Sequence, residues 1–334
     1  MKCVKVPLRQ LNDTRIKLME NGLMNMEYRI KTDDEFGYIP INDNIEGYEI
    51  VCMYLESMKK VPHNFSELLE DELSSEEIEN LRTSFDTIGD IVILEIPDEL
   101  LDKKQIIGDA ALKFTKRKSI YMKKSAIKGT TRVRDLEFLS GIDDSVTIHK
   151  EHGARLKLDV REVYFSPRLA TERKRVMESV EDGEKILDMF CGIGPFPIVI
   201  ARNKNVDITA VDINESAIRY LDENIKLNKL KGSVKSYCGD VRKVSESFNF
   251  KFDRIIMNLP GLAYTFLDVA FNLIDDSGII NYYEFSDSYE QGIERLESAA
   301  SAIGKQVEIV NCRKVKSTSP GEWHVAIDGK VYDK

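Results

Sequence analysis

The most constraining feature of the sequence is a regular alternation of strand-like and helix-like segments from Val163 to the C-terminus. A buried apolar segment, EKILDMF, is followed by a glycine-containing loop, and helical and strand patterns then take turns along the chain. Strands that alternate with helices form a parallel sheet covered on both faces. The last two strand-like segments, VEIVNCRKVK and EWHVAIDGK, have no helix between them. We therefore predict a doubly wound, mostly parallel α/β domain over residues 161–334, with an antiparallel edge hairpin.

Two smaller α+β domains are predicted upstream, over residues 1–60 and 61–160. The first combines a helical pattern, LNDTRIKLMENGL, with short strand-like segments. The second has one strand, GDIVILEIP, a helix through LLDKKQIIGDAALKFTKR and four segments that alternate like strands. A length of 334 residues suits two or three domains.

The charge distribution points to a phosphate-rich partner more than the net charge does. The chain carries a net charge of −9, but residues 110–134 contain nine Lys or Arg and no acid. A local positive field attracts nucleic acid, although a solvated basic face would explain the same pattern. The candidate RNA-binding residues in this segment are Lys123, Lys124, Lys128 and Arg134.

Several classes of protein are disfavoured by composition. The five cysteines are scattered without a CxxC pair and there are four histidines, so we expect neither a disulfide framework nor a metal site. No apolar run approaches the roughly 18 residues that span a bilayer, and the first 20 residues lack the apolar centre of a secretory signal. We expect a cytoplasmic protein, and a monomer, since no heptad pattern or exposed apolar stripe is visible.

The loop after the buried strand has the features of a cofactor site. Gly192 and Gly194 allow close approach of a ligand and leave amide groups free at a helix N-terminus. A dinucleotide fingerprint requires a third glycine, where this chain has Pro197. The loop opens with Asp188, an awkward neighbour for a pyrophosphate but a favourable one for the ammonium group of a methionine moiety.

The following strands also end in suitable residues. Asp212 ends the second strand and is placed to accept hydrogen bonds from ribose hydroxyls, Asp240 follows the third and suits an adenine amino group, and Asn258 follows the fourth. Each acid alone could be a helix N-cap, but the set predicts S-adenosylmethionine. The expected cofactor-binding residues are Asp188, Phe190, Gly192, Gly194, Asp212, Ile213, Asp240, Val241 and Asn258.

From about residue 132 onward the chain resembles the archaeal and eukaryotic tRNA (guanine-37) N1-methyltransferase family. The motifs that carry this resemblance are RVRDLEFLSG, TIHKEHG, VYFSPRLATER, DMFCGIGPF, VDIN and IMNLP. It implies a Rossmann-like, class I methyltransferase fold, a tRNA partner, and catalytic roles for Glu172, Arg132, Asn258 and Pro260. It also places Tyr164, Arg168 and Arg173 in the substrate-facing motif. Members of the family usually carry a lysine after Asn-Leu-Pro, where this chain has Gly261.

The chemistry of guanine explains why such residues are needed. N1 carries a proton in the neutral base, so the resemblance makes Glu172 the general base and Arg132 the group that stabilises charge on O6. Glu172 could instead pair with Lys174 or Arg175 on the same helix. Arg132 could equally be a phosphate contact.

Three other functions remain open. The first is transfer of the aminocarboxypropyl group in wyosine synthesis, against which the Asn-Leu-Pro segment argues. The second is methylation of carbon 7 of a wyosine precursor, alone or as an additional activity. The third is non-catalytic RNA binding by a protein that keeps a cofactor pocket.

Overall fold

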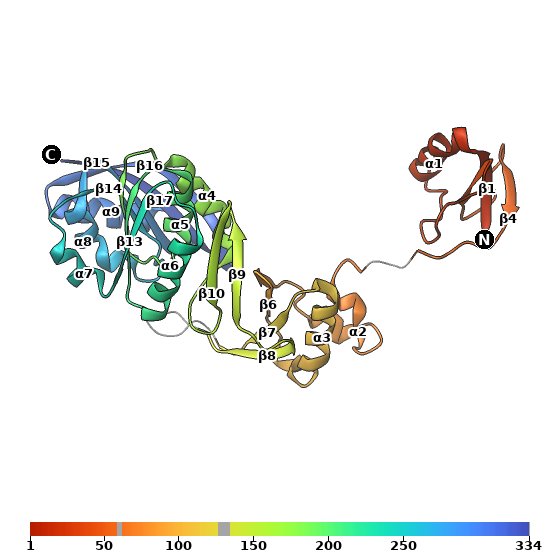
Figure 1. Cartoon of the computed structure of the whole chain (residues 1–334), viewed down its shortest axis with the longest axis horizontal. Coiled ribbons are helices and arrows are strands. Elements are labelled where there is room, and N and C mark those ends of the chain that lie inside the picture. The colour runs from red at the N-terminus through yellow and green to blue at the C-terminus, as the bar shows by residue number, and fades with distance from the viewer. Residues whose placement is uncertain (59–61, 126–133, 334) are drawn as a thin grey trace. The chain divides into compact units, whose positions relative to one another are not determined.

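The computed structural model describes residues 1–58, 62–125 and 134–333, which fall into two compact units, Met1–His63 and Asn64–Lys334 (Figure 1). The predicted boundary near residue 60 lies close to the division between these units. Residues 64–160 belong to the same compact unit as the remainder of the chain. The separate domain predicted for residues 61–160 therefore stays a prediction.

The first unit is a four-stranded antiparallel sheet in the order β2-β3-β1-β4 with one helix packed on it. Leu18 of the helix packs against Val4 and Ile39 of the two central strands. The central strand β1, KCVKVP, in which Cys3, Val4 and Val6 are buried, was not predicted. The elements are β1 (Lys2–Pro7), η1 (Leu8–Gln10), α1 (Leu11–Glu20), β2 (Lys31–Thr32), β3 (Phe36–Pro40) and β4 (Glu49–Cys52).

The second unit begins with a four-stranded sheet in the order β5-β6-β7-β8, in which only β6 and β7 are parallel. The apolar face of α3, with Ile107 and Ala111, packs against Val92 and Ile120 of the two central strands. The elements are η2 (Phe65–Leu68), α2 (Ser75–Asn80), β5 (Asp86–Ile88), β6 (Ile91–Leu94), η3 (Asp98–Lys103), α3 (Lys104–Thr115), β7 (Ser119–Lys123) and β8 (Leu136–Gly141).

A hairpin of β9 (Val146–Glu151) and β10 (Ala154–Asp159) connects this sheet to the remainder of the unit (Figure 1). The backbone of Gly89 donates to His149 Nδ1 at 3.3 Å, which ties the hairpin to the four-stranded sheet. On its other side the hairpin lies along α6 (Glu215–Leu227), whose Asn224 accepts from the Lys157 backbone at 2.6 Å. The hairpin therefore fixes the small sheet in place beside the large one.

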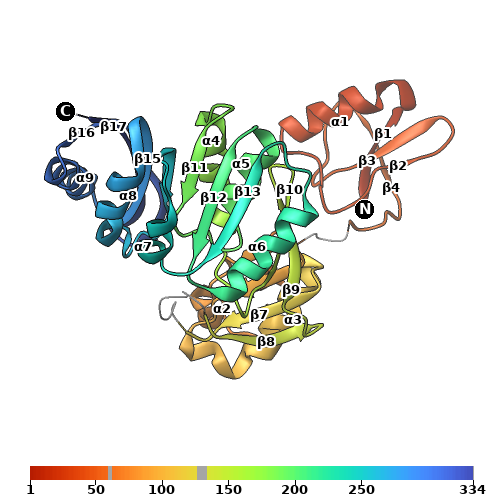
Figure 2. The same cartoon turned by 60° about the vertical axis from the view of Figure 1, so that its left-hand side comes forward.

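The C-terminal part contains a seven-stranded sheet in the order β13-β12-β11-β14-β15-β17-β16. The pairs from β13 to β15 are parallel, whereas β17 is antiparallel to both β15 and β16, and Figure 2 shows β11, β12 and β13 side by side. The predicted doubly wound sheet with an antiparallel edge hairpin is confirmed. The strands are β11 (Lys185–Asp188), β12 (Asp207–Asp212), β13 (Ser233–Cys238), β14 (Phe252–Met257), β15 (Ile274–Ser286), β16 (Lys305–Ser319) and β17 (Glu322–Asp333).

Helices cover both faces of this sheet. On one face, Val176 of α4 and Phe196 of α5 pack against Ile186 and Tyr283 of the strands. The other face is covered by α8 and α9, which share a core with β14, β15 and β17. The helices are η4 (Pro167–Leu169), α4 (Ala170–Ser179), α5 (Pro195–Asn203), α6 (Glu215–Leu227), α7 (Val241–Val244), η5 (Ser245–Ser247), η6 (Ala263–Phe266), α8 (Leu267–Leu273) and α9 (Glu290–Ala302).

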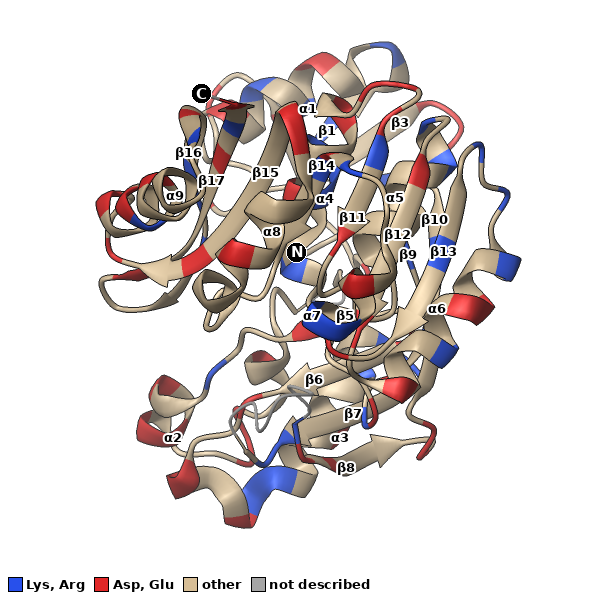
Figure 3. Ribbon diagram, turned by 90° about the vertical axis from the view of Figure 1, so that its left-hand side faces the viewer, with Lys and Arg blue, Asp and Glu red and all other residues tan. Residues whose placement is uncertain are grey.

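Charged residues of both signs are distributed along the ribbon, with α2 and α9 mainly acidic (Figure 3). Within the described part of the chain, no helix has the length and apolar character needed to cross a membrane.

Candidate active site

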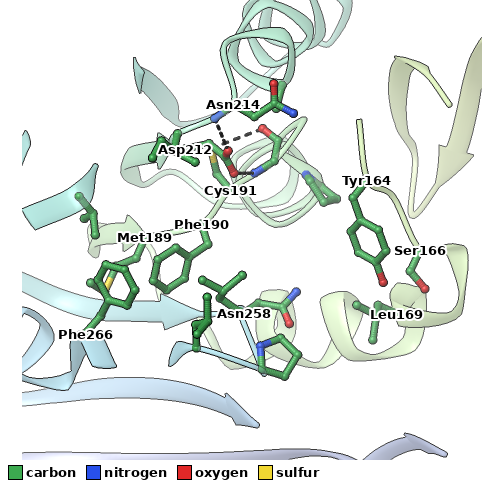
Figure 4. Close-up of a pocket in the computed structure, with 18 of the residues that line it drawn as sticks. Tyr164, Ser166, Leu169, Met189, Phe190, Cys191, Asp212, Asn214, Asn258 and Phe266 are labelled. Carbon is green, nitrogen blue, oxygen red and sulfur yellow. Dashed lines mark hydrogen bonds between the residues drawn. The ribbon is translucent and has the colours of Figure 1, made fainter. Parts of the chain in front are cut away.

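A cavity of about 380 Å³ opens at the carboxyl ends of β11, β12, β13 and β14, the edge where ligands bind in doubly wound sheets. Figure 4 shows Tyr164 and Ser166 on one side of it, Met189, Phe190 and Phe266 on the other, and Asn258 between them. The remaining lining residues are Phe165, Leu169, Arg173, Cys191, Gly192, Pro195, Asp212, Ile213, Asn214, Ala217, Gly239, Asp240, Val241, Arg242, Leu259, Pro260, Leu262, Thr265, Phe285, Lys316 and His324.

The glycine loop connects the end of β11 to the start of α5. Gly194 has a φ of 82°, which favours glycine, and a Cβ there would lie 2.3 Å from Leu221 Cδ1. Pro195 then occupies the first position of α5, where no hydrogen-bond donor is lost. Glycine is therefore required at position 194 by both the backbone conformation and the packing of Leu221, whereas Gly192 is the glycine of this loop that lines the cavity.

Asp188 is the most unusual group near the cavity: it directly precedes the lining residue Met189 but is not itself among the described residues that line the cavity. Its side chain is 1% exposed; Oδ1 accepts a hydrogen bond from the Phe190 backbone at 3.2 Å, and Oδ2 has no partner among the described residues. Burial raises the pKa of the Asp188 carboxyl to about 8, an effect that the Phe190 hydrogen bond opposes and the nearby Asp212 carboxylate increases. A buried carboxylate oxygen without a partner is costly unless a ligand satisfies it. Asp188 thus fits the ammonium group of a methionine moiety.

Asp212 holds two loops together at the end of β12. Its Oδ2 accepts from the Gly192 backbone at 2.7 Å and its Oδ1 from the Asn214 backbone at 2.9 Å (Figure 4). Burial raises the pKa of the Asp212 carboxyl, and these backbone hydrogen bonds oppose that rise. The N-cap of α6 is Asn214, which accepts from Ser216. Asp212 is therefore not the helix cap, and it remains available to a ribose as well.

We expect Asp212→Asn to lower both stability and cofactor affinity. The amide supplies only one acceptor oxygen, so one of the two backbone donors, Gly192 or Asn214, loses its partner. An unsatisfied buried donor costs about 1–3 kcal/mol, which urea unfolding without cofactor will measure. Unchanged stability, or an unchanged dissociation constant for S-adenosylmethionine in calorimetry, would contradict this assignment.

The expected adenine region combines apolar walls with polar side chains, among them Asp240 and Arg242. Asp240 lines the cavity and is also the N-cap of α7, accepting from the Arg242 backbone at 2.9 Å. The helix-capping alternative therefore holds for Asp240, in contrast to Asp212. Val241 is buried, whereas Ile213 is 52% exposed at the cavity rim. Phe190 packs edge-to-face on Phe266 with ring centroids 4.9 Å apart. These walls suit a flat aromatic ring.

Asn258 and Pro260 follow β14 and line the cavity beside the expected cofactor region. Asn258 Oδ1 is buried and has no hydrogen-bond partner within the described part of the chain. It is therefore available to a group in the cavity. Gly261, where the family usually has lysine, is exposed, and a Cβ there would have no neighbour within 4 Å.

A second cavity of about 330 Å³ continues from the first, toward the four-stranded sheet of β5, β6, β7 and β8. Its cations are Lys123, Arg134, Arg168 and Lys316, and its acids are Asp86 and Glu95. The walls common to both cavities are Tyr164, Phe165, Ser166, Phe285 and Lys316. A predominantly positive cavity that opens into a cofactor-sized one is suited to a nucleotide.

The predicted RNA-binding cations are largely paired with acids. Arg168 donates to Asp86 at 2.6 Å, Lys123 lies 3.6 Å from Asp86, and Lys124 lies 3.6 Å from Glu137. Burial lowers the pKa of the Lys123 ammonium. The predicted residues Lys128 and Arg132 lie outside the described residues.

Two of the four charged residues of the TERKR segment, Glu172 and Arg173, are placed differently from expectation. Arg173 reaches the cavity wall, but its guanidinium is buried and donates to both carboxylate oxygens of Glu151, at 2.5 and 2.6 Å, so it is not a free cation. Glu172 is 1% exposed and is not among the described residues that line either cavity. It pairs with Arg175 at 2.7 Å, the structural alternative considered from the sequence.

Several cavity residues were not predicted. Phe285 from β15, Lys316 from β16 and His324 from β17 reach the cavity from the antiparallel part of the sheet. The hairpin pattern was visible in the sequence, but nothing in it indicated which residues face the cofactor end. Among residues 1–58, 62–125 and 134–333, no group of three or more His, Cys, Asp and Glu side chains is placed to hold a metal ion.

The fold and the cavity together define the class of protein. The chain has a seven-stranded, doubly wound sheet, a glycine loop, a buried acid at the end of β11 with one oxygen that has no partner among the described residues, and acids at the ends of the next two strands. These features are those of a class I methyltransferase that uses S-adenosylmethionine.

Comparison with known proteins identifies the family. The family model "TRM5/TYW2 methyltransferase domain" matches residues 147–310, and models of the TYW2 N-terminal domain and the tRNA methyltransferase 5 N-terminal domain match residues 65–145 and 3–49. The tRNA (guanine(37)-N(1))-methyltransferase Trm5b of Pyrococcus abyssi is 42% identical over 332 residues, 98% of both chains. The chain belongs to the TRM5/TYW2 methyltransferase family, and it is an S-adenosylmethionine-dependent methyltransferase. The family resemblance seen in the motifs is confirmed.

Two further relatives are informative. The structure described as the complex of aTrm5 and tRNALeu superposes with a TM-score of 0.85 and 37% identity, covering 99% of each chain. The tRNA(Phe) (4-demethylwyosine(37)-C(7)) aminocarboxypropyltransferase of Methanocaldococcus jannaschii is 36% identical over 253 residues, 74% of this chain and 97% of its own. The second relative thus spans its own length while leaving a quarter of this chain unmatched.

Proposed function

We propose that this chain transfers a methyl group from S-adenosylmethionine to N1 of guanine 37 in tRNA. The observation that supports this most is the full-length similarity to Trm5b, which extends through the N-terminal unit. The aminocarboxypropyltransferase relative matches only 74% of the chain. Sequence identity also favours methyl transfer, since it is 42% to Trm5b over 332 residues and 36% to the aminocarboxypropyltransferase over 253 residues.

The proposed roles follow from the positions of the residues. When bound, S-adenosylmethionine supplies an activated methyl group. Asp188 holds the ammonium of its methionine moiety, Asp212 its ribose and Asp240 its adenine, while the nucleobase enters through the second cavity beside Tyr164. Asn258, whose amide oxygen is free, holds the edge of the base, and Pro260 keeps the loop rigid.

Proton removal from N1 is assigned to Glu172, and stabilisation of charge on O6 to Arg132. Glu172 is paired with Arg175 in the structure, so this role requires its carboxylate to leave that partner and turn to the cavity. The role of Arg132 rests on the family motif.

Labelled cofactor distinguishes the candidate reactions. We expect a tRNA transcript with guanosine 37 to acquire label from methyl-labelled but not from carboxyl-labelled S-adenosylmethionine, and digestion to yield 1-methylguanosine. A transcript with adenosine 37 should stay unlabelled. Inosine 37, which keeps N1 but lacks the exocyclic amine, should still be methylated. Uptake of the carboxyl label would establish aminocarboxypropyl transfer instead, and no uptake with any RNA would leave only a binding function.

A further inference from the structure

Arg175 on α4 bridges two buried carboxylates. It donates to Glu172 Oε1 at 2.7 Å through Nη2 and to both oxygens of Asp328 on β17, at 2.5 and 3.1 Å. Glu172 and Asp328 are 1% and 5% exposed. The Arg175 guanidinium therefore joins two carboxylates that are separated by 156 positions in the sequence.

Asp328 is fixed independently of Glu172. Its Oδ1 accepts from Asn281 at 2.7 Å and its Oδ2 from Asn311 at 3.0 Å, on the two neighbouring strands. Asn281 in turn accepts from the buried Arg254 at 3.2 Å. Asp328 is therefore held by strands on both sides, and it would keep its place and its bond to Arg175 if Glu172 moved.

Glu172 has only one hydrogen bond to the sheet among the described residues. Besides Arg175, its carboxylate accepts from the Tyr283 hydroxyl at 2.8 Å, and Arg313 Nε lies 3.5 Å from Oε2. The charged and titratable groups described around Glu172 are therefore Tyr283, Arg313 and Arg175, and Asp328 is linked to Glu172 through Arg175.

The cavity lies close to Glu172 on two sides. Leu169 and Arg173, which lie three positions before it and one after, both line the cavity, so Glu172 is at the edge of the same helix face. The Tyr283 ring also contacts His324, a lining residue, with centroids 5.4 Å apart. A change of side-chain rotamer moves a carboxylate without moving the helix.

We propose that Asp328 is a positioning residue for Glu172: it retains Arg175 while Glu172 turns from Arg175 to the nucleobase. The inference rests on the proposed function, in which Glu172 accepts the N1 proton. The Arg175 side chain is partly buried, with 21% of its surface exposed, and leaving its guanidinium without a carboxylate partner is unfavourable. Without Asp328 the departure of Glu172 would therefore be opposed. Tyr283 opposes the turn of Glu172 to the nucleobase, because its hydrogen bond to Glu172 exists only while Glu172 is paired with Arg175.

The two substitutions Asp328→Asn and Tyr283→Phe therefore have effects of opposite sign on single-turnover methyl transfer at saturating tRNA and S-adenosylmethionine. We expect the Asp328→Asn rate to fall by about tenfold or more, equivalent to at least about 1.4 kcal/mol, with both dissociation constants unchanged. The Tyr283→Phe rate should equal or exceed that of the wild type. Tyr282→Phe is the matched control, because Tyr282 donates to Glu284 at 2.7 Å and neither residue lines the cavity.

The outcomes separate this inference from the proposed function. A wild-type rate for Asp328→Asn, or a Tyr283→Phe rate that falls as far as that of Asp328→Asn, would overturn it, since a purely structural network loses activity whichever member is changed. If thermal melting shows that Asp328→Asn does not fold, the Tyr283→Phe rate decides: at or above wild type supports the inference, below it does not. Activity retained by Glu172→Gln would instead remove the general base itself, and with it the proposed mechanism.

Discussion

Glu172→Gln is expected to reduce single-turnover methyl transfer by about a hundredfold to ten-thousandfold, the usual contribution of a general base. Glutamine has nearly the same shape but does not accept the N1 proton, and Arg175 keeps its bond to Asp328. Affinity for tRNA should change little, because Glu172 is buried and contacts protein groups only. Rapid-quench kinetics with a guanosine-37 transcript measures the rate, and filter binding measures the affinity.

The chain contains a matched control for this variant. Glu284 is also 1% exposed, and it accepts from a tyrosine hydroxyl, Tyr282, and from an arginine, Arg295, both at 2.7 Å. It is not among the described residues that line the cavities. Glu284→Gln should therefore lose a comparable buried ion pair and keep the methyl-transfer rate. Equal losses of rate and tRNA affinity in Glu172→Gln would show that Glu172 is structural.

Asp188→Asn is expected to weaken S-adenosylmethionine binding by about ten- to a hundredfold, the value of a buried hydrogen bond to a charged group. In the absence of cofactor, the same substitution should increase the stability of the folded protein. The folded-state pKa of Asp188 is about 8, above the usual 3.8, so wild-type stability is lost as pH rises between these values. Asparagine does not ionise, so its melting temperature should exceed that of the wild type at pH 8.

The pH dependence makes this prediction specific. At pH 5 the difference between the melting temperatures should be small. The wild-type carboxyl is then protonated in the folded state, and the pH is only slightly above the pKa of 3.8 in the unfolded state. The control is Asp253→Asn, at the opposite end of the sheet, where the carboxylate accepts from the Lys185 backbone. Cofactor affinity should be unchanged in this control. A lower melting temperature for Asp188→Asn at pH 8 would show that the carboxylate is already satisfied without ligand.

The sequence predicted the elements with strong periodicity. Strand and helix patterns from Val163 onward correspond to the parallel strands and to the edge hairpin of β16 and β17. Two of the described strands were missed: β5 has three residues, which is too few to show alternation, and β1 buries the consecutive residues Cys3 and Val4, so its pattern does not alternate strictly. The cofactor residues were accessible because parallel strands bring their carboxyl ends to one edge, whatever the details of packing.

Long-range pairing was not accessible in the same way. Nothing in the sequence indicates that Asp328 forms an ion pair with Arg175, or that Glu151 accepts hydrogen bonds from both Nε and Nη2 of Arg173. These contacts depend on the register of β17 and of the β9–β10 hairpin, which a single sequence does not define. The basic segment had the same difficulty, since its charge was visible but the acids that pair with Lys123 and Lys124 come from other strands.

The most direct test of the account is a structure of the protein with a guanosine-37 tRNA and an unreactive analogue of S-adenosylmethionine. The account predicts that a Glu172 oxygen lies about 2.6–3.2 Å from guanine N1, within hydrogen-bond reach, while Arg175 stays bound to Asp328. A guanine seated in the cavity with Glu172 still on Arg175, and another side chain facing N1, would contradict it.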